Sequence, residues 1–254
     1  IIAYEYVNPR EHQRYYMENL VYLTDCYQVN DSKRKNSEHT SMRAEAGLPE
    51  KGFVFCCFNN SYKITPQMFD IWMRLLNNVE NAVLWVIERH DVTATNLRCE
   101  AQARGVDPNR LVFAPHAKLE DHLARHRLAD LFLDTLPYNA HTTASDALWA
   151  GLPVLTCAGT TFAGRVAGSL LRAVGLPELI TSTLEEYEAL ALKLATGDNL
   201  MRQIREKLGR NRLTKPLFDT GRFRRHIEAA YTIMWEVHQR GEEPRSFAVK
   251  PFDG

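Results

Sequence analysis

The segment LADLFLDTLPYNAHTTASDALWAGLPVLT, residues 128–156, decides the fold predicted for this chain. Its first part, LADLFLDT, is a short apolar run that ends in Asp and is typical of a buried parallel strand. The Pro and Asn of LPYNA indicate a loop. We expect a helix to open at HTT (141–143) and to end at Gly151 and Pro153, just before the strand PVLT. The segment therefore predicts a strand–loop–helix–strand unit of a parallel α/β sheet.

The predicted helix start at Thr142 would lie just beyond the carboxyl end of a parallel strand. Free amides and the positive end of the helix dipole make such a position an anion site, usually for phosphate. Asp146 follows four residues later on the same helix face, where its carboxylate could accept hydrogen bonds from ribose hydroxyls. The residues leave an alternative open: Thr142 or Thr143 only caps the helix, and Asp146 is a solvated first-turn acid.

The composition bounds the class of protein. The 254 residues suffice for one large α/β domain or two smaller ones, and the 45% hydrophobic content is typical of a globular protein. Lys and Arg number 31, as do Asp and Glu, so we expect no nucleic-acid partner. No apolar run reaches the ~20 residues of a membrane helix, so we expect no membrane partner. The chain begins at Ile1 without an initiator methionine, which favours a fragment or a trimmed start.

The five cysteines have no regular spacing, and Cys56 and Cys57 are adjacent within an apolar run. This pattern does not indicate a disulfide framework. It favours a reducing, cytoplasmic location in which thiols are buried as small apolar groups. The sequence has no C-x-x-C pair, and no Asp-x-Asp motif ends a predicted strand, so we expect no metal cofactor.

Predicted strands and helices alternate from residue 52 to residue 195, which indicates an α/β fold with a doubly wound parallel sheet. Neither G-x-G-x-x-G nor G-x-x-x-x-G-K-[ST] occurs, so helix starts and threonines would have to hold a phosphate. Apolar runs and helical periodicity predict further strands at 52–58, 82–87, 110–114 and 179–180, and helices at 65–76, 94–104, from 119, up to 171, 185–195, 198–212 and 222–239.

The two ends of the chain are less regular. Residues 1–50 are rich in Tyr and charge, and they are interpreted either as a linker or as the tail of a preceding domain. Residues 240–254 are expected to form a frayed tail. The helix at 222–239 carries an apolar stripe, which is more typical of core packing than of cofactor contact. The stripe consists of Phe223, Ile227, Tyr231, Met234 and Trp235.

Three polar positions follow predicted strands. Lys63 lies after the strand at 52–58, at the edge where open α/β sheets bind ligands, and its compact cation could neutralise a phosphate. The alternative is an exposed loop lysine. His122 lies near a helix start, where a neutral imidazole could stack on a base or donate to it, or could be a surface histidine. Thr160 and Thr161 could contact phosphate or could cap a helix.

Four motifs resemble, in order and spacing, those of the protein O-linked N-acetylglucosamine transferase family, and most closely its bacterial members. They are FNNSYKITP (58–66), FAPHAKLEDH (113–122), LFLDTLPYNAHTTASDALWAGLPVLT (131–156) and PLFDT with a terminal helix ending in MWE (216–236). The resemblance covers about residues 20–240. It implies the Rossmann-like carboxyl lobe of a two-lobe, GT-B type glycosyltransferase that holds UDP-N-acetylglucosamine.

The resemblance also implies roles for single residues. Lys63 matches the lysine that neutralises the leaving diphosphate, and Asp146 matches the residue that takes the ribose hydroxyls. Asn60 is a shorter amide where Gln is familiar, and Leu119 stands where a lysine near the ribose is common. The other implied donor-binding residues are His141, Thr142 and Thr143 at the phosphate, His122 at the uracil, and Ala117 through its backbone.

The implied activity is inverting transfer of N-acetylglucosamine from UDP to a Ser or Thr hydroxyl of a protein or peptide. The chain would be the donor-binding half, with residues 1–50 as amino-lobe tail and linker, 51–215 as the donor-binding lobe, and 216–254 as a terminal helix crossing back to the amino lobe. The amino lobe and tetratricopeptide repeats would lie outside this chain. The alternatives are O-fucosyl transfer from GDP-fucose and a non-catalytic nucleotide-sugar-binding module.

Overall fold

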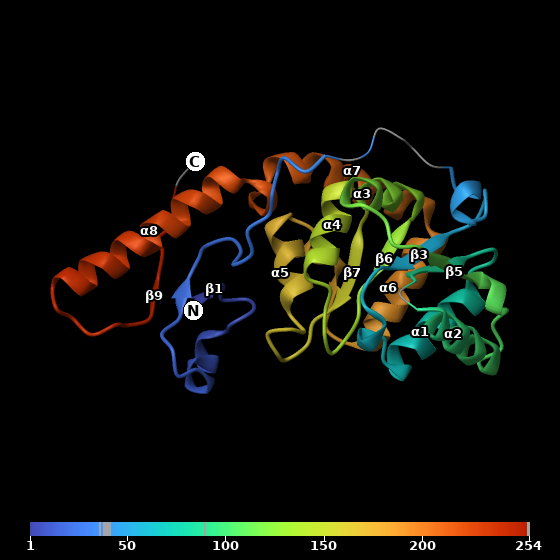
Figure 1. The fold of residues 1–254 in the computed structure, drawn as a ribbon, viewed down its shortest axis with the longest axis horizontal. Helices are drawn as coiled ribbons and strands as arrows, with labels where there is room; N and C mark the ends of the chain where they lie inside the picture. Colours follow the sequence, from blue (N-terminus) through green and yellow to red (C-terminus); the bar gives the residue numbers. More distant parts are fainter. Residues whose placement is uncertain (36, 38–41, 89, 253–254) are drawn as a thin grey trace.

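A computed structural model describes residues 1–35, 37, 42–88 and 90–252. Its centre is a six-stranded parallel sheet with the strand order β5-β4-β3-β6-β7-β8 (Figure 1). The strands are β3 (Val54–Cys57), β4 (Val83–Ile87), β5 (Leu111–Ala114), β6 (Leu131–Leu133), β7 (Val154–Cys157) and β8 (Ile180–Thr181). This arrangement confirms the predicted doubly wound parallel sheet.

The order of the strands reverses between β3 and β6. The chain runs from β3 through β4 to the edge strand β5, returns to the centre at β6, and continues through β7 to β8. β3 and β6 pair in parallel, with Phe55 opposite Leu131 and Cys56 opposite Phe132. The loops that leave their carboxyl ends lead to opposite sides of the sheet, and such a reversal opens a crevice where α/β proteins bind ligands.

Helices cover both faces of the sheet. On one face α1 packs against α6, and on the other α4 packs against both α3 and α5, as right-handed crossovers require. Trp72 of α1, Trp85 of β4 and Tyr187 of α6 are among the largest fully buried side chains. The helices are α1 (Pro66–Asn78), α2 (Asp91–Ala103), α3 (Leu119–Arg125), α4 (Thr142–Ala150), α5 (Val166–Ala173), α6 (Leu184–Thr196), α7 (Asp198–Thr214) and α8 (Thr220–Gln239).

Local signals at several helix ends act as the sequence predicts. The Thr65 hydroxyl accepts a hydrogen bond from the Met68 amide at the start of α1, and Pro66 occupies the first helical position. Gly151 ends α4 with a φ of 88°, a left-handed conformation that favours glycine. Thr183 caps α6 by accepting from the Glu186 amide.

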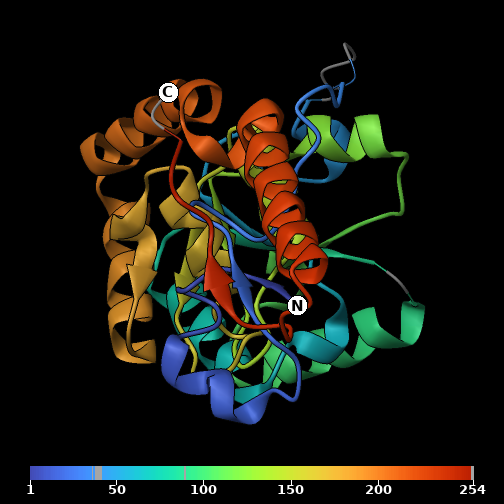
Figure 2. The same cartoon turned by 90° about the vertical axis from the view of Figure 1, so that its left-hand side faces the viewer.

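The ends of the chain form a second, smaller sheet. Strand β2 (Val21–Tyr22) lies between β1 (Ile2–Ala3) and β9 (Phe247–Ala248), and all three run parallel. Figure 2 shows red β9 beside the blue amino-terminal strands. The prediction of a frayed tail for residues 240–254 is therefore wrong, because Phe247 pairs with Val21. In the irregular region before residue 50, positions 36 and 38–41 lie outside the described residues.

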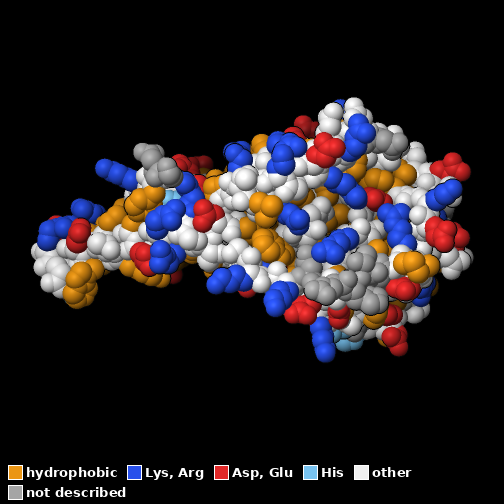
Figure 3. Space-filling view, turned by 90° about the horizontal axis from the view of Figure 1, so that it is seen from above, with side chains coloured by type: hydrophobic (Ala, Val, Ile, Leu, Met, Phe, Trp, Pro, Cys, Tyr) orange, Lys and Arg blue, Asp and Glu red, His pale blue; other side chains and the backbone are white. Residues whose placement is uncertain are grey.

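Helix α8 projects away from the large lobe, which is the part of the chain built around the six-stranded sheet (Figures 1 and 3). One side of α8 contributes buried Ala230 and partly buried Met234 to a cluster with Val21 of β2. Tyr231 and Trp235 point elsewhere and remain 57% and 61% exposed. The prediction that the whole apolar stripe packs in a core is wrong for these two residues, because they lie outside the cluster that α8 forms with the small sheet.

Candidate functional site

Lys63 lies beside the opening of α4, as predicted. It ends a short 3-10 helix (Ser61–Lys63) that follows β3, and its Nζ donates to the backbone oxygen of Asn139 over 2.8 Å. The same ammonium lies 4.0 Å from the centroid of the Tyr138 ring. Asn139 precedes Thr142 by three residues. The alternative of an exposed loop lysine is wrong, because Lys63 is half-buried and burial lowers its pKa.

The first turn of α4 is not capped by a threonine side chain. His141 is the N-cap residue and makes no side-chain hydrogen bond to the amides of that turn. Its ring stacks on Tyr138 with centroids 5.1 Å apart, and burial lowers its pKa. Thr142 is exposed, and the Thr143 hydroxyl donates to Asn59 Oδ1. The alternative in which Thr142 or Thr143 only caps the helix is therefore wrong.

Asn59 joins the end of β3 to α4. This residue is 1% exposed, and its Nδ2 donates to the Thr135 hydroxyl over 2.9 Å while its Oδ1 accepts from Thr143. The sequence pointed instead to the neighbouring Asn60, which is half-buried and is the N-cap of the 3-10 helix that carries Lys63. The two adjacent amides have the same chemistry, so nothing in the sequence singled out the buried one.

Asp134 is a second residue that the sequence reasoning did not select. Its fully buried carboxylate accepts from the amides of Thr135 and Ala140, over 2.7 and 2.6 Å, and from the Thr156 hydroxyl over 2.6 Å. Burial raises the pKa of Asp134 to about 7. These bonds hold the loop between β6 and α4 against β7. The sequence signal for such a residue is an acid at the end of an apolar run. Burying a carboxylate there costs free energy unless it is hydrogen-bonded.

His122 and Ala117 lie beyond the end of β5. Ala117 is half-buried in the loop before α3, and the His122 ring lies 5.4 Å from the ring centroid of Phe58. Arg125 contacts His122 Nδ1 and donates to the Pro115 oxygen over 2.6 Å, so it ties this loop to α3. The alternative of a surface histidine is wrong, because His122 is half-buried.

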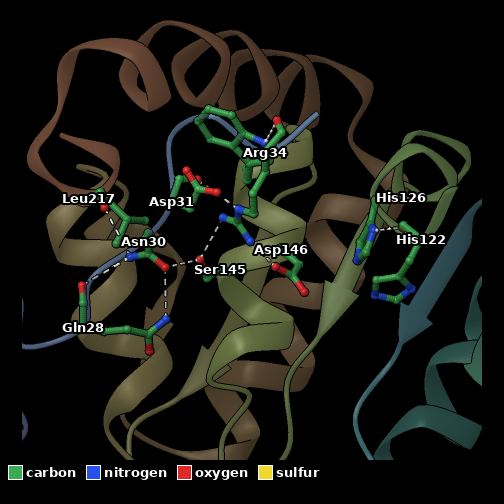
Figure 4. Close-up of polar contacts among 10 residues, drawn as sticks. Gln28, Asn30, Asp31, Arg34, His122, His126, Ser145, Asp146 and Leu217 are labelled. Carbon is green, nitrogen blue, oxygen red and sulfur yellow. Dashed lines mark hydrogen bonds and ion pairs between the residues drawn. The ribbon is translucent and has the colours of Figure 1, made fainter. Parts of the chain in front are cut away.

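Asp146 is buried, and an arginine from the amino-terminal region reaches it. The residue is 6% exposed, and Arg34 forms an ion pair with its Oδ1 (Figure 4). Burial raises the pKa of Asp146, and the charge of Arg34 opposes this rise. The alternative of a solvated first-turn acid is therefore wrong. Arg34 belongs to a polar loop that the sequence did not connect with this site.

Three remaining positions are peripheral. Leu119 is 53% exposed at the start of α3. Thr161 accepts from the Gly164 amide over 3.2 Å, so its hydroxyl serves a turn, while Thr160 is exposed.

Four of the cysteines are buried, and Cys99 is exposed. Within the described ranges, no three His, Cys, Asp or Glu side chains are grouped so that they could hold a metal ion. No helix there has the length and apolar character to cross a membrane.

The model of glycosyl transferase family 41 matches residues 31–227, which is more than half of the chain. This chain belongs to glycosyl transferase family 41. Membership of family 41 confirms the resemblance on which the expected site residues depend.

Several curated proteins and solved structures are similar to this family 41 chain. The probable UDP-N-acetylglucosamine–peptide N-acetylglucosaminyltransferase SEC of Arabidopsis thaliana is 39% identical over 98% of this chain and 26% of its own length. The corresponding transferase of Caenorhabditis elegans is 37% identical over 81% of this chain and 18% of its own length. A mutant O-GlcNAc transferase of Thermobaculum terrenum superposes with a TM-score of 0.80 at 32% identity, over 94% of this chain and 46% of that one. The structural match confirms the GT-B type lobe.

Proposed function

We propose that this chain is the donor-binding half of an inverting glycosyltransferase that moves N-acetylglucosamine from UDP-N-acetylglucosamine to Ser or Thr hydroxyls of proteins. Membership of family 41 and the names of its relatives support the reaction. The observation that carries the proposal is the contact from Lys63 Nζ to the Asn139 oxygen. It brings a cation to the opening of α4, where amides can bind an anion.

The chemistry requires charge stabilisation at the leaving group. The acceptor oxygen forms a bond to the anomeric carbon from the face opposite the diphosphate, and the proton of the acceptor hydroxyl passes to solvent water. The bond from that carbon to the diphosphate oxygen breaks, and UDP leaves with the electron pair. Lys63 and the amides of α4 would stabilise the negative charge that develops on the diphosphate. Asn139 accepts from one of the three N–H donors of the ammonium, which leaves others to point toward phosphate oxygens.

The nucleoside would lie along α4 and α3. Asp146 would accept from the ribose hydroxyls, His122 would stack on the uracil, and the backbone of Ala117 would meet the edge of the base. The packing of α3 against α4 supports this placement. Asn60 would reach the donor beside Lys63 with a shorter side chain than the usual glutamine. No metal ion is part of the proposal.

The remaining parts of the transferase would come from residues outside this chain. The chain spans about a quarter or less of the length of the Arabidopsis thaliana and Caenorhabditis elegans relatives, so the amino lobe, the tetratricopeptide repeats and the protein acceptor belong to the proposal. Residues 1–50 would be the tail of the amino lobe and the linker, and the terminal helix within 216–254 would cross back to that lobe. The exposed Tyr231 and Trp235 on projecting α8 support this arrangement, because large exposed apolar side chains mark interaction surfaces.

Titration calorimetry with UDP and GDP tests the donor assignment. We expect the full chain to bind UDP more tightly than GDP by about tenfold or more, the effect of one lost polar contact to the base. Preference for GDP would overturn the assignment in favour of a fucosyl donor. Tight UDP binding without sugar transfer to a Ser/Thr peptide, measured when the amino lobe is present, would instead favour a non-catalytic binding module.

A further inference from the structure

Arg34 reaches Asp146 from outside the large lobe. It lies in a segment that crosses α4, which we call the strap (residues 28–35) (Figure 4). Arg34 Nη1 pairs with Asp146 Oδ1, and Nη2 contacts the Ser145 hydroxyl at 3.4 Å. The two charged side chains are only 11% and 8% exposed. A pair this far removed from water is screened weakly, so each partner strongly influences the charge of the other.

The guanidinium of Arg34 is held in place from several sides. Its Nε donates to the backbone oxygen of Asp31 over 3.0 Å. The Trp149 indole donates to the Arg34 backbone oxygen over 3.2 Å. Asn30 fixes the same strap, because its Oδ1 accepts from the Ser145 hydroxyl and its Nδ2 donates to the Leu217 oxygen. Figure 4 shows these bonds on one side of α4. The side chain therefore loses little further freedom when a ligand binds beside it.

The ion pair occupies one oxygen of Asp146 and leaves the other. Within the described part of the chain, the hydrogen bond to the carboxylate ends on Oδ1. Oδ2 accepts no hydrogen bond from the described residues and keeps contact with solvent. A carboxylate oxygen held in this way can accept hydrogen bonds from two vicinal hydroxyls, because it carries two lone pairs.

Burial and Arg34 determine the charge of Asp146. Burial raises the pKa of the carboxyl, and Arg34 is the charged group that lowers it. Several charged and titratable groups on the elements around α4 have other partners. They include His122 and Arg125 of α3, which contact each other, His126, which bonds the His122 oxygen, Arg172 of α5, which lies over the Tyr6 ring, and Arg212 of α7, which donates to the Trp149 oxygen.

We propose that Arg34 is a positioning residue for the donor, since its guanidinium holds the Asp146 carboxylate ionised and oriented so that the free oxygen accepts from the ribose hydroxyls. This inference rests on the proposed function, in which Asp146 is the ribose ligand. Arg34 acts through Asp146 and is not itself required to touch the nucleotide.

Calorimetry of the full chain with two nucleotides tests the inference. UDP and 2′,3′-dideoxy-UDP differ only in the ribose hydroxyls. The ratio of the Kd of 2′,3′-dideoxy-UDP to the Kd of UDP therefore does not depend on the titration of the phosphates. We expect the wild type to keep a constant ratio between pH 8 and pH 6. In Arg34→Met the ratio should fall by about tenfold or more at pH 6, the size of a lost hydrogen bond to a charged group, and recover partly at pH 8. Arg34→Lys should restore part of it.

Matched variants separate the possible failures. Arg43→Met breaks an ion pair with Asp130, which lies at the amino ends of the central strands β3 and β6, and it should leave the ratio unchanged. In an Asp146→Asn background, Arg34→Met should have no further effect. If Arg34→Met does not fold, Arg34→Gln serves the same comparison, since it retains hydrogen-bond donors but loses the charge.

The outcomes are distinguishable. An Asp146→Asn chain that keeps the wild-type ratio would overturn the proposed role of Asp146. A lowered ratio in Asp146→Asn, together with an unchanged ratio in the neutral Arg34 variant at every pH, would overturn only the inference about Arg34. A loss that is the same for both nucleotides would also overturn it, because it would indicate a structural effect that does not pass through the ribose.

Discussion

The ammonium of Lys63 donates to the backbone oxygen of Asn139 over 2.8 Å, which links the two central strands at the point where the strand order reverses. Lys63 follows β3, whereas Asn139 belongs to the loop between β6 and α4. The contact therefore combines a cation and a helix start that are far apart in the sequence.

Replacing Lys63 by Ala should separate binding from turnover. We expect the Lys63→Ala variant to keep UDP affinity within a few-fold, because the α4 amides remain, but to lower kcat by about 10² or more, as for loss of one group that stabilises a leaving charge. The measurement is sugar transfer to a Ser/Thr peptide with the amino lobe present, alongside calorimetry with UDP. Lys193→Ala, an exposed lysine of α6, is the control. Undiminished turnover in Lys63→Ala would rule out the leaving-group role.

Asn59 should matter for both stability and donor affinity. In the Asn59→Ala variant the Thr135 and Thr143 hydroxyls lose their hydrogen bonds to Asn59. We therefore expect the free energy of unfolding to fall by ~1–3 kcal/mol and UDP to bind more weakly. Urea unfolding and calorimetry measure the two effects. Asn78→Ala, at an exposed position of α1, should change neither. A destabilised Asn59→Ala chain with wild-type UDP affinity would show that Asn59 supports the fold alone.

Buried His126 should make the chain less stable in acid. Burial lowers its pKa to about 3, while the unfolded residue titrates near ~6.5. Between these values the unfolded chain binds a proton that the folded chain does not, so this group lowers the free energy of unfolding by up to ~1.4 kcal/mol per pH unit as the pH falls. His126→Phe should flatten that dependence in urea unfolding at pH 7, 6 and 5. The exposed His116→Gln should not.

Asp134 should contribute with the opposite sign. Its folded pKa of about 7 lies above the ordinary value of 3.8, so the folded chain holds the proton between them and the unfolded chain does not. The contribution of Asp134 to stability is thus fully present below about pH 4 and is lost as the pH rises through about 7. The stability advantage of wild type over Asp134→Asn should shrink from pH 5 to pH 7.5. Exposed Asp107→Asn is the control, and a pH-independent difference for Asp134→Asn would contradict the prediction.

Trp235 should be dispensable for folding of this chain. Because its side chain is 61% exposed, Trp235→Ala should change the free energy of unfolding by no more than ~0.5 kcal/mol. A core tryptophan would cost about 3–5 kcal/mol. Ala230→Glu places a charge at a fully buried position of the same helix and should destabilise strongly. With the amino lobe present, Trp235→Ala should lower activity if α8 contacts that lobe. A core-sized loss of stability would contradict the exposed placement.

The central sheet and the position of Lys63 were predictable because they depend on local pattern. Apolar runs followed by caps mark strands and helices, and parallel strands place their following loops at one edge. This reasoning needed no knowledge of side-chain packing. It brought Lys63 and Thr142 to the same edge, which is where the structure has them.

The supporting contacts were not predictable because they join residues without a shared periodicity. Arg34 and Asp146 lie 112 positions apart, and the loop around Arg34 has no pattern that specifies a partner. Adjacent amides at 59 and 60 differ only in the direction of their side chains. A two-residue strand such as β9 is too short to show alternation, and a helical stripe indicates which side chains share a face but not how much of that face is covered.

The small sheet constrains the order in which the molecule can fold. Its middle strand meets β9 across a separation of 226 residues, as the bond from the Leu20 amide to the Ser246 hydroxyl shows. Closing so long a loop is slow and entropically costly before the intervening chain is compact. Strand β2 therefore stays unpaired on the side of β9 until residues 247–248 have been synthesised and the chain between the two strands is compact.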